Sequence, residues 1–280
     1  MTRRRRNLIH KMAVYIGALI VFLIMAFPLY NLFLTSVQRE SDVRSPDISF
    51  IPEYIMLDHY QTVLSPGHIV PIREAMANSL LVSTLTALIT MLLAVPATYA
   101  LTRMRLRGRN YILLGLASIY LLPTILFVFP LFIQAVRVGL VDTYVGLLIP
   151  YVAFTLPFTI IILRAFLQGI PVEIEEAARI DGCNQFQLFF RIVLPLMKPG
   201  ILAGLLVIFI LSWIEFLTPL LFTRDIQILT VVLGLYRSTY DIHLGQMAAA
   251  AIIASLPVVL LITVFQRLIT RVVVSGGGGE

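Results

Sequence analysis

The charged residues most able to do chemistry in this sequence lie close together, between Gly169 and Pro195. The first half of the segment reads Gly-Ile-Pro-Val-Glu-Ile-Glu-Glu-Ala-Ala-Arg-Ile-Asp-Gly and ends at Gly182. Glu176 and Arg179 offer charge-assisted hydrogen bonds to a partner, and the small alanines beside them allow close approach. The chemistry of this segment is therefore that of a docking surface for another protein.

The spacing within this segment predicts a first short helix. Pro171 suits a first helical turn, and the acidic residues that follow suit the positive end of the helix dipole. Gly182 stands where the helix stops and a left-handed backbone is needed. Helical spacing places three apolar residues on one face: Ile174, Ala177 and Ala178.

A second short helix is predicted to follow the turn. Asn184 can cap its N-terminus, and we expect it to stop before Pro195, because proline disfavours a helical conformation of the residue before it. The two helices together form a helix–turn–helix elbow, which is too polar for the interior of a lipid bilayer.

Glu215 is a separate candidate, because it is the only acidic residue well inside an apolar stretch. A carboxylate inside a membrane is a functional hypothesis by default, here as part of a pathway or gate with the adjacent Trp213. The alternative is a hydrogen bond that only holds helices together.

Other chemistry finds little support. A phosphate-binding P-loop requires glycine before its lysine, and neither Lys11 nor Lys198, the only lysines, has one. Cys183 is the only cysteine, so it can form no intrachain disulfide. No apolar stretch carries a cluster of residues that could be argued for catalysis or metal binding.

The elements that position these residues follow from composition. Of the 280 residues, 59% are hydrophobic and 13% are charged, and the mean hydropathy is +0.93. Soluble chains carry roughly 45–50% apolar and about 25% charged residues. A soluble enzyme and a disordered chain are therefore excluded. The net charge of +6 does not indicate nucleic acid binding, because the basic residues lie between apolar stretches.

A membrane-spanning helix needs about 20 mainly apolar residues. Six stretches qualify, at residues 12–34, 78–102, 111–136, 144–166, 199–222 and 246–268. Fifteen of the 21 Lys and Arg residues fall at the two termini and in the connections on the same side. This asymmetry predicts that both termini are cytoplasmic. The first stretch is longer than the apolar part of a signal peptide and lacks a cleavage site, so we expect an uncleaved span.

The elbow carries a resemblance to a family. Glu176-Ala177-Ala178, then Gly182, then Ile192-Val193-Leu194-Pro195 matches the full spacing of the EAA loop of ABC importer permeases. The residues around this motif are similar to those of the carbohydrate-uptake branch, and within it to those of the maltose-type second permease. The resemblance covers roughly residues 70–270.

What the resemblance implies is a type I ABC importer permease fold: an all-α membrane protein of six transmembrane helices with a cytoplasmic coupling helix. Residues 1–70 would hold the tail, the first span and an outer loop. Residues 71–270 would form the permease core, with the coupling loop at 167–200, and residues 271–280 a Gly-rich tail. The chain would sit in a bacterial or archaeal cytoplasmic membrane.

The resemblance also implies partners. These are a second homologous permease, two ABC ATPase subunits that hold ATP and Mg²⁺, and an extracytoplasmic solute-binding protein that delivers a sugar. No cofactor is expected on this chain, and it is not expected to be an enzyme. Contact with an ATPase would be made through Glu173, Glu176, Ala177, Ala178, Arg179, Asp181, Gly182, Ile192, Leu194 and Pro195. Contact with the binding protein would be made through Arg224, Asp225, Tyr240 and His243.

Two alternatives stay open at this point. The same architecture could carry another solute, such as glycerol phosphate or a polyamine, because the elbow indicates coupling to an ATPase and says nothing about which solute is transported. An ion-coupled carrier would work without ATP, but it usually needs several ionisable groups inside the membrane.

Overall fold

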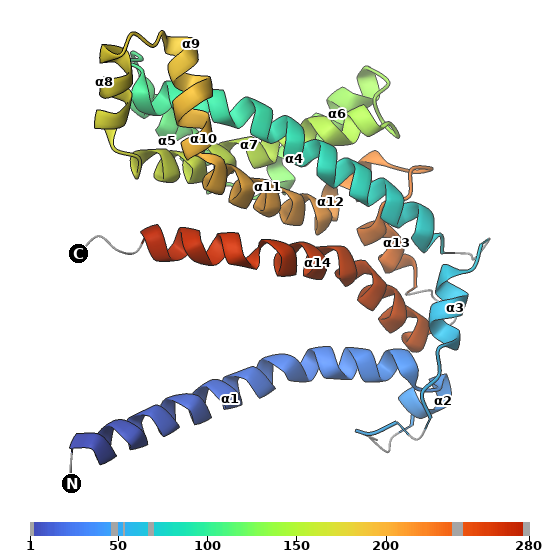
Figure 1. Cartoon of the computed structure of the whole chain (residues 1–280). Helices are drawn as coiled ribbons and strands as arrows, with labels where there is room; N and C mark the ends of the chain where they lie inside the picture. The colour runs from blue at the N-terminus through green and yellow to red at the C-terminus, as the bar shows by residue number, and fades with distance from the viewer. Residues whose placement is uncertain (1–2, 46–49, 53, 67–69, 237–242, 277–280) are drawn as a thin grey trace. The chain divides into compact units, whose positions relative to one another are not determined.

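A computed structural model of the chain describes residues 3–45, 50–52, 54–66, 70–236 and 243–276 (Figure 1). Every regular element within these residues is helical, which confirms the all-α prediction. The chain divides into two compact units. One comprises Met1–Ile72 with Leu233–Ser255, and the other comprises Arg73–Val232 with Leu256–Glu280.

The first unit contains α1 (Arg3–Val37), α2 (Glu40–Val43), α3 (Asp58–Leu64) and the beginning of α14 (Leu244–Gly276). The Glu40 carboxylate accepts hydrogen bonds from the backbone N–H of Leu244 at 3.0 Å and of Gly245 at 3.1 Å. It thereby supplies a negative charge to the positive end of α14. The His59 ring lies so close to Gly245 that a Cβ there would overlap it.

The second unit is built around α7, which packs against α5, α11 and α12. Its other helices include α4, which runs beside α7 and is joined to it by a 2.9 Å hydrogen bond between the hydroxyls of Thr90 and Thr155. The elements of this unit are α4 (Ile72–Arg103), α5 (Arg109–Ile119), α6 (Ile125–Arg137), α7 (Tyr144–Gln168), α8 (Val172–Ile180), α9 (Gln185–Gln187), the π-helical η1 (Leu188–Val193), α10 (Leu194–Leu196), α11 (Lys198–Trp213) and α12 (Leu217–Phe222). The division between the units falls inside α13 (Leu229–Leu235), after Val232, and inside α14, after Ser255.

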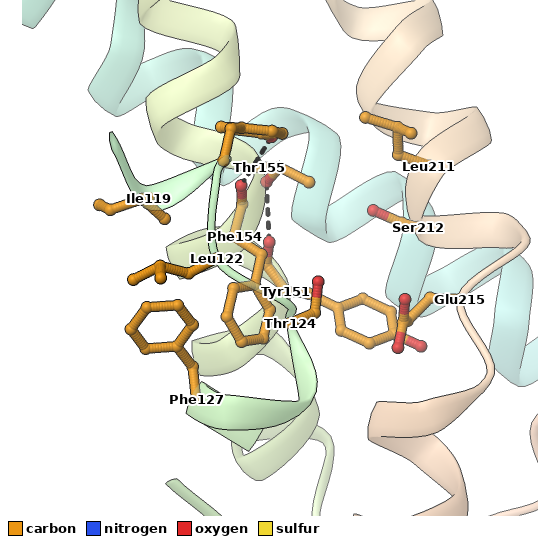
Figure 2. A pocket seen from close by; sticks show the side chains of 11 residues that line it. Ile119, Leu122, Thr124, Phe127, Tyr151, Phe154, Thr155, Leu211, Ser212 and Glu215 are labelled. Carbon is orange, nitrogen blue, oxygen red and sulfur yellow. Dashed lines mark hydrogen bonds between the residues drawn. The ribbon is translucent and has the colours of Figure 1, made fainter. Parts of the chain in front are cut away.

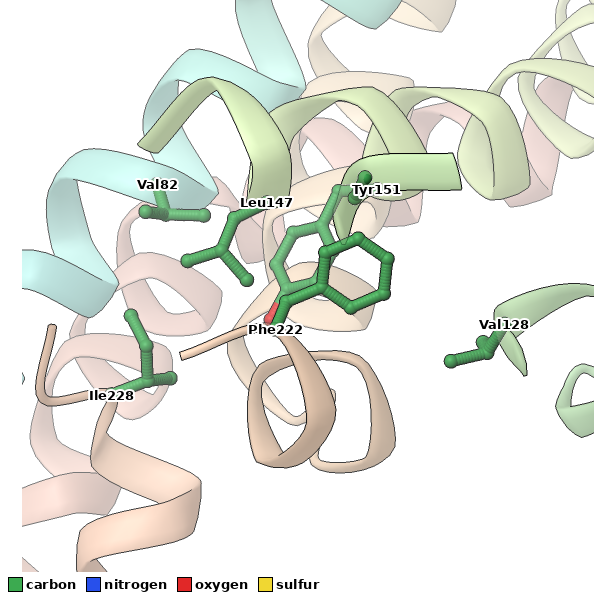
Figure 3. Close-up of a cluster of buried hydrophobic side chains, with 7 residues drawn as sticks. Val82, Val128, Leu147, Tyr151, Phe222 and Ile228 are labelled. Atoms are coloured by element: carbon green, nitrogen blue, oxygen red, sulfur yellow. The ribbon is translucent and has the colours of Figure 1, made fainter. Parts of the chain in front are cut away.

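An apolar cluster joins α4, α6, α7 and α12 (Figure 3). Leu147 and Val128 are fully buried in it, and Phe222 contacts Phe132 edge-on with ring centroids 5.6 Å apart. In a lipid environment such packing, rather than exclusion of water, holds helices together. The cluster fixes the end of α12, and therefore the position of the short segment that precedes it.

Four helices in the described residues are long and apolar enough to cross a membrane: His10–Val37, Ile72–Arg103, Tyr144–Gln168 and Leu244–Gln266. The bent pair Gln185–Leu196 and Lys198–Trp213 would make a fifth. The four long helices match four of the six predicted spans, and Lys198–Trp213 covers only the first part of the predicted span 199–222.

The predicted span 111–136 is not continuous. It consists of α5 and α6 with a break at residues 120–124. Pro123 has no N–H to bond to the carbonyl of Ile119, and its ring disfavours a helical Leu122. The predicted span 199–222 is interrupted in the same way between α11 and α12.

Candidate functional site

The first arm of the elbow is α8, which begins after Pro171 and carries Glu173 and Glu175 in its first turn. Gly182 has φ +88°. It lets the chain turn so that the N–H of Gly182 bonds to the carbonyl of Arg179 at 3.1 Å, and that of Cys183 to Ala178 at 3.0 Å. This pair of bonds is a Schellman motif, which satisfies carbonyls at a helix end. The predicted stop at Gly182 is confirmed.

The second arm runs from α9 through η1 to α10. The N–H of Gln187 donates to the Asn184 side chain at 2.8 Å, and the N–H of Asn184 donates to the Gln187 side chain at 3.0 Å. This reciprocal cap confirms Asn184 as the start of the second helix. The predicted stop before Pro195 is wrong, because Pro195 lies inside α10. The wider π-helical turns of η1 come directly before the proline, and the chain then bends by 69° into α11.

A buried ion pair attaches the elbow to the helix bundle. The Nε of Arg103, at the end of α4, lies 2.7 Å from Oε1 of Glu175 in α8. The Arg103 side chain is 11% exposed and that of Glu175 is 2% exposed. Another nitrogen of Arg103 donates to the carbonyls of Leu167 at 3.0 Å and Ile170 at 2.6 Å. One guanidinium therefore joins the ends of α4 and α7 to the first turn of α8.

A tyrosine extends this connection to the second arm. The Tyr99 hydroxyl lies 3.4 Å from Oε2 of Glu175 and accepts a 2.7 Å hydrogen bond from the side-chain amide of Gln185. Its ring also contacts Phe189, with centroids 5.1 Å apart. Both arms of the elbow are thus fixed to α4. Figure 1 shows α8 and α9 at the end of the bundle where α4 and α7 finish.

The outer surface of the elbow carries most of the predicted contact residues. Ile180 is 86% exposed. Six of the predicted contact residues are also exposed: Glu173, Glu176, Ala177, Arg179, Asp181 and Gly182. Because α8 is helical, Ile174, Ala177 and Ala178 share one face as predicted. That face is not the buried side of the helix: Ala178 and Glu175 are buried, whereas Ile174 is 40% exposed.

The remaining predicted coupling residues belong to the second arm. Ile192 and Leu194 are half-buried where η1 meets α10, and Pro195 is exposed. They shape the return of the chain into the bundle rather than the outermost surface of the elbow.

Glu215 lies in the break between α11 and α12. Its Oε1 accepts hydrogen bonds from the Thr218 N–H at 2.9 Å and the Thr218 hydroxyl at 3.0 Å. Because Pro219 has no N–H to bond to the Glu215 carbonyl, that carbonyl accepts from the Thr230 hydroxyl at 2.7 Å instead. Glu215 also lines a cavity of about 210 Å³. Trp213 is buried, stacks on Phe209 with centroids 5.5 Å apart, and does not line this cavity.

Asp142 holds the loop that contains Arg224 and Asp225. Its carboxylate accepts backbone hydrogen bonds from Arg224 at 2.9 Å, Asp225 at 3.1 Å and Ile226 at 3.0 Å. Its own φ is +59°, which is uncommon for a residue other than glycine. The N–H groups of Arg224 and Ile226 hold the pKa of the Asp142 carboxyl below its ordinary value. The side chains of Arg224 and Asp225 remain exposed.

The other two predicted binding-protein contacts are Tyr240 and His243. Tyr240 lies outside the described residues, as do residues 277–280 of the predicted tail. His243 is exposed just before α14, in the first of the two units.

The sequence of this chain matches a known family of membrane components. The family described as "Binding-protein-dependent transport system inner membrane component" matches residues 79–274. The chain belongs to this family. It is a multi-pass permease component of the inner membrane, and it is a transport subunit rather than an enzyme.

Relatives and a solved structure agree with this assignment. The permease is 32% identical over 279 residues to the inner membrane ABC transporter permease protein YcjP of Escherichia coli K12, covering 99% of each chain. It is 27% identical to the diacetylchitobiose uptake system permease protein DasC of Streptomyces coelicolor, over 94% of this chain and 95% of the relative. A chain of a bacterial ABC transporter that imports the acidic polysaccharide alginate matches with a TM-score of 0.75 and 25% identity. That match covers 95% of this chain and 98% of the other.

Several residues of the site are absent from the sequence prediction. Arg103, Glu175 and Asp142 act through contacts with residues far away in sequence. From the sequence, Glu175 was only one of the acidic residues that follow Pro171 at the start of the predicted helix. Asp142 had no predicted role and lay in the connection between the predicted spans 111–136 and 144–166. Arg103 follows a predicted span directly, which places it at the membrane surface, but no signal indicated its partner.

Proposed function

We propose that this permease forms one transmembrane half of an ATP-driven sugar importer, and that its elbow (residues 172–196) receives the motion of an ATPase subunit. The observation that carries the proposal is the buried Arg103–Glu175 pair. It fixes α8 to the ends of α4 and α7 while Glu176, Ala177 and Ile180 stay exposed.

This arrangement suits the transmission of force. An elbow joined to the bundle only through flexible loops would move without moving the helices. Here a displacement of α8 acts on α4 and α7 through one guanidinium, and on α11 through η1 and the bend after α10. Pulling on the elbow therefore tilts three helices together, which is how closure of an ATPase could open a pathway.

The surface of the elbow suits a protein partner better than a lipid surface. A helix lying on a bilayer favours a Lys- and Arg-rich polar face, whereas α8 exposes Glu173 and Glu176 beside Arg179. Exposed Ala177 allows close approach, and Ile180 and Phe186, 86% and 71% exposed, offer apolar surface to a partner. We propose that ATP and Mg²⁺ are bound by such partner subunits.

The other partners follow from the family. A second homologous permease would complete the pathway, with residues 71–270 of this chain as its core and 167–200 as its coupling loop. A solute-binding protein would dock on the outer side, where Asp142 presents the side chains of Arg224 and Asp225. Tyr240 and His243 remain further candidates for that contact.

A sugar is the proposed cargo. The diacetylchitobiose permease and the alginate transporter both handle saccharides, and both align along nearly the whole of this chain. The test is to purify the intact complex through a tag on this chain, identify the proteins recovered, and measure uptake in vesicles. Recovery of a P-loop ATPase with ATP-dependent sugar uptake supports the proposal. Uptake of sugar without ATP, by the chain alone, contradicts it.

A further inference from the structure

The cavity beside Glu215 has the features of a ligand-binding site. It lies where α7 and α11 meet the broken segment between α5 and α6, and Figure 2 shows side chains from all of these converging on it. All of its lining residues belong to the second unit. A helix break on each side, at residues 120–124 and 214–216, leaves the space that a continuous helix would fill.

Two hydroxyl groups in this cavity have no hydrogen-bond partner. Tyr151 is 3% exposed and Ser212 is 5% exposed, and neither hydroxyl has a partner within the described residues. Buried hydroxyl groups are normally satisfied, because leaving one unpaired costs free energy. Their arrangement therefore indicates a group that arrives from outside the chain.

Glu215 adds a third polar atom. Both hydrogen bonds to its carboxylate from Thr218 go to Oε1, and Oε2 accepts none from the described residues. Figure 2 shows the Tyr151 ring directed toward Glu215, with Ser212 on the same side of the cavity. Two hydroxyls and a carboxylate oxygen together can donate to and accept from the hydroxyl groups of a ligand.

The other walls are aromatic. Phe127 and Phe154 line the cavity, with ring centroids 6.4 Å apart, and the Tyr120 hydroxyl is already bonded to the Phe154 carbonyl at 3.0 Å. Apolar walls with a few convergent polar groups are typical of small-molecule sites. A sugar ring presents apolar C–H faces and polar edges, and both kinds of wall are present here.

Charge narrows the ligand further. The lining contains no lysine, arginine or histidine, so an acidic sugar would find no cation, and the Glu215 carboxylate would repel it. The volume of about 210 Å³ is below the roughly 300–1,000 Å³ of pockets for drug-sized ligands. The space therefore suits one sugar ring rather than a chain of them.

We propose that this cavity binds one ring of an uncharged sugar as the cargo passes through the permease. The inference rests on the proposed function, since it assigns the substrate class and the contacting groups of the same transport pathway. Tyr151 and Ser212 bind hydroxyl groups of the sugar, Glu215 accepts from another, and the phenylalanines cover its apolar face.

The test uses the intact importer reconstituted in vesicles with its binding protein. The probes are N,N′-diacetylchitobiose and neutral arabinose and glucose oligosaccharides, compared with acidic alginate oligosaccharides. ATP-driven uptake of a neutral probe is expected. If only the acidic probes are taken up, this inference is overturned while the proposed function stands. If no sugar is taken up in an ATP-dependent way, the proposed function itself fails.

Substitutions then test the cavity on the sugar that is transported. Tyr151→Phe and Ser212→Ala remove hydroxyls that hold nothing in the chain, so folding is preserved. Each is expected to raise the KM for uptake about five- to tenfold, with hydrolysis of ATP in the absence of sugar unchanged. The matched control is Thr86→Val, which removes a buried hydroxyl that also lacks a partner but lies outside the cavity. An unchanged KM in both variants would show a water-filled cavity only and overturn the inference.

Discussion

The Nε of Arg103 lies 2.7 Å from Oε1 of Glu175, in a position where both side chains are almost fully buried. The two residues come from the last turn of α4 and the first turn of α8. The atoms face one another as an ion pair without the alignment of a hydrogen bond. The attachment of the elbow therefore depends on charge, and a buried charge is stable only while its partner is present.

Replacing one residue of this pair should lower the free energy of unfolding more than replacing both. Arg103→Met leaves Glu175 buried and unpaired, which we expect to destabilise the permease by about 3–5 kcal/mol. Adding Glu175→Gln should recover much of that loss, because no unpaired charge remains. Thermal unfolding of the purified protein in detergent measures both. A double variant as unstable as the two single losses added together would show that the residues act independently.

Gly182 should be required for coupling rather than for folding. Gly182→Val places a β-branched residue at φ +88°, where the strain is roughly 1–2 kcal/mol. We expect normal membrane insertion but ATP hydrolysis that no longer drives uptake. Gly139→Val is the matched control, because Gly139 has φ +72° and open space around it but lies away from the elbow. Equal loss of coupling in both variants would indicate general strain and no special role for the elbow.

Two glycines of α11, Gly200 and Gly204, should differ in their tolerance of a methyl group. A Cβ at Gly200 would lie 2.7 Å from Cγ of the Phe166 ring. One at Gly204 would lie 2.7 Å from the terminal methyl of Met91, with a methyl of Leu163 at an ordinary contact distance of 3.8 Å. Methionine can change rotamer easily, and an aromatic ring near its backbone cannot. We expect Gly200→Ala to cost about 1–3 kcal/mol and Gly204→Ala clearly less, as measured by thermal unfolding. The reverse order would contradict this packing.

The loop at Arg224–Ile226 should depend on the charge of Asp142. Its pKa is lowered by the N–H groups of Arg224 and Ile226. The ionised form is therefore favoured in the folded state, and the stabilisation is present above the ordinary value of 3.8. It is lost as the pH falls below that value through the folded pKa.

Hydrogen exchange of the three backbone amides measures this effect. At pH 7, Asp142→Asn should raise their exchange about tenfold, because charge-assisted hydrogen bonds are lost. The ratio of variant to unmodified rates should stay constant between pH 7 and pH 5. Equal exchange in both proteins at pH 7 would show that the loop is held by other contacts.

Local structure in the elbow was predictable because its signals are adjacent in sequence. Gly182 and Asn184 each act on residues within four positions, so their spacing alone indicated a helix stop at Gly182 and a cap at Asn184. Arg103 and Glu175 could not be paired in advance, because 103 and 175 are joined only by the packing of α4 on α7 and α8. The inward turn of Glu175 also explains why the buried side of α8 is not centred on the apolar face of Ile174, Ala177 and Ala178.

The breaks within the predicted spans could not be foreseen from the positions of their prolines, for a related reason. Pro28, Pro96 and Pro257 lie inside continuous helices, whereas Pro123 marks a break. Whether a proline interrupts a helix depends on neighbouring groups that satisfy the freed carbonyl. At Glu215 that group is the Thr230 hydroxyl, 15 residues away. Hydropathy cannot report such a partner, so the cavity between the breaks was also missed.

The most direct measurement concerns the surface of the elbow. Ala177→Arg adds a large side chain where close approach to the ATPase is proposed, and Ser41→Arg adds the same group at an exposed position in the other unit. Each variant is purified from its membrane through a tag on this chain, and the recovered ATPase is quantified together with ATP-dependent uptake. We predict that Ala177→Arg loses the ATPase and uptake but retains the second permease, while Ser41→Arg keeps all three. Normal recovery of the ATPase and normal uptake with Ala177→Arg would contradict the coupling role of the elbow.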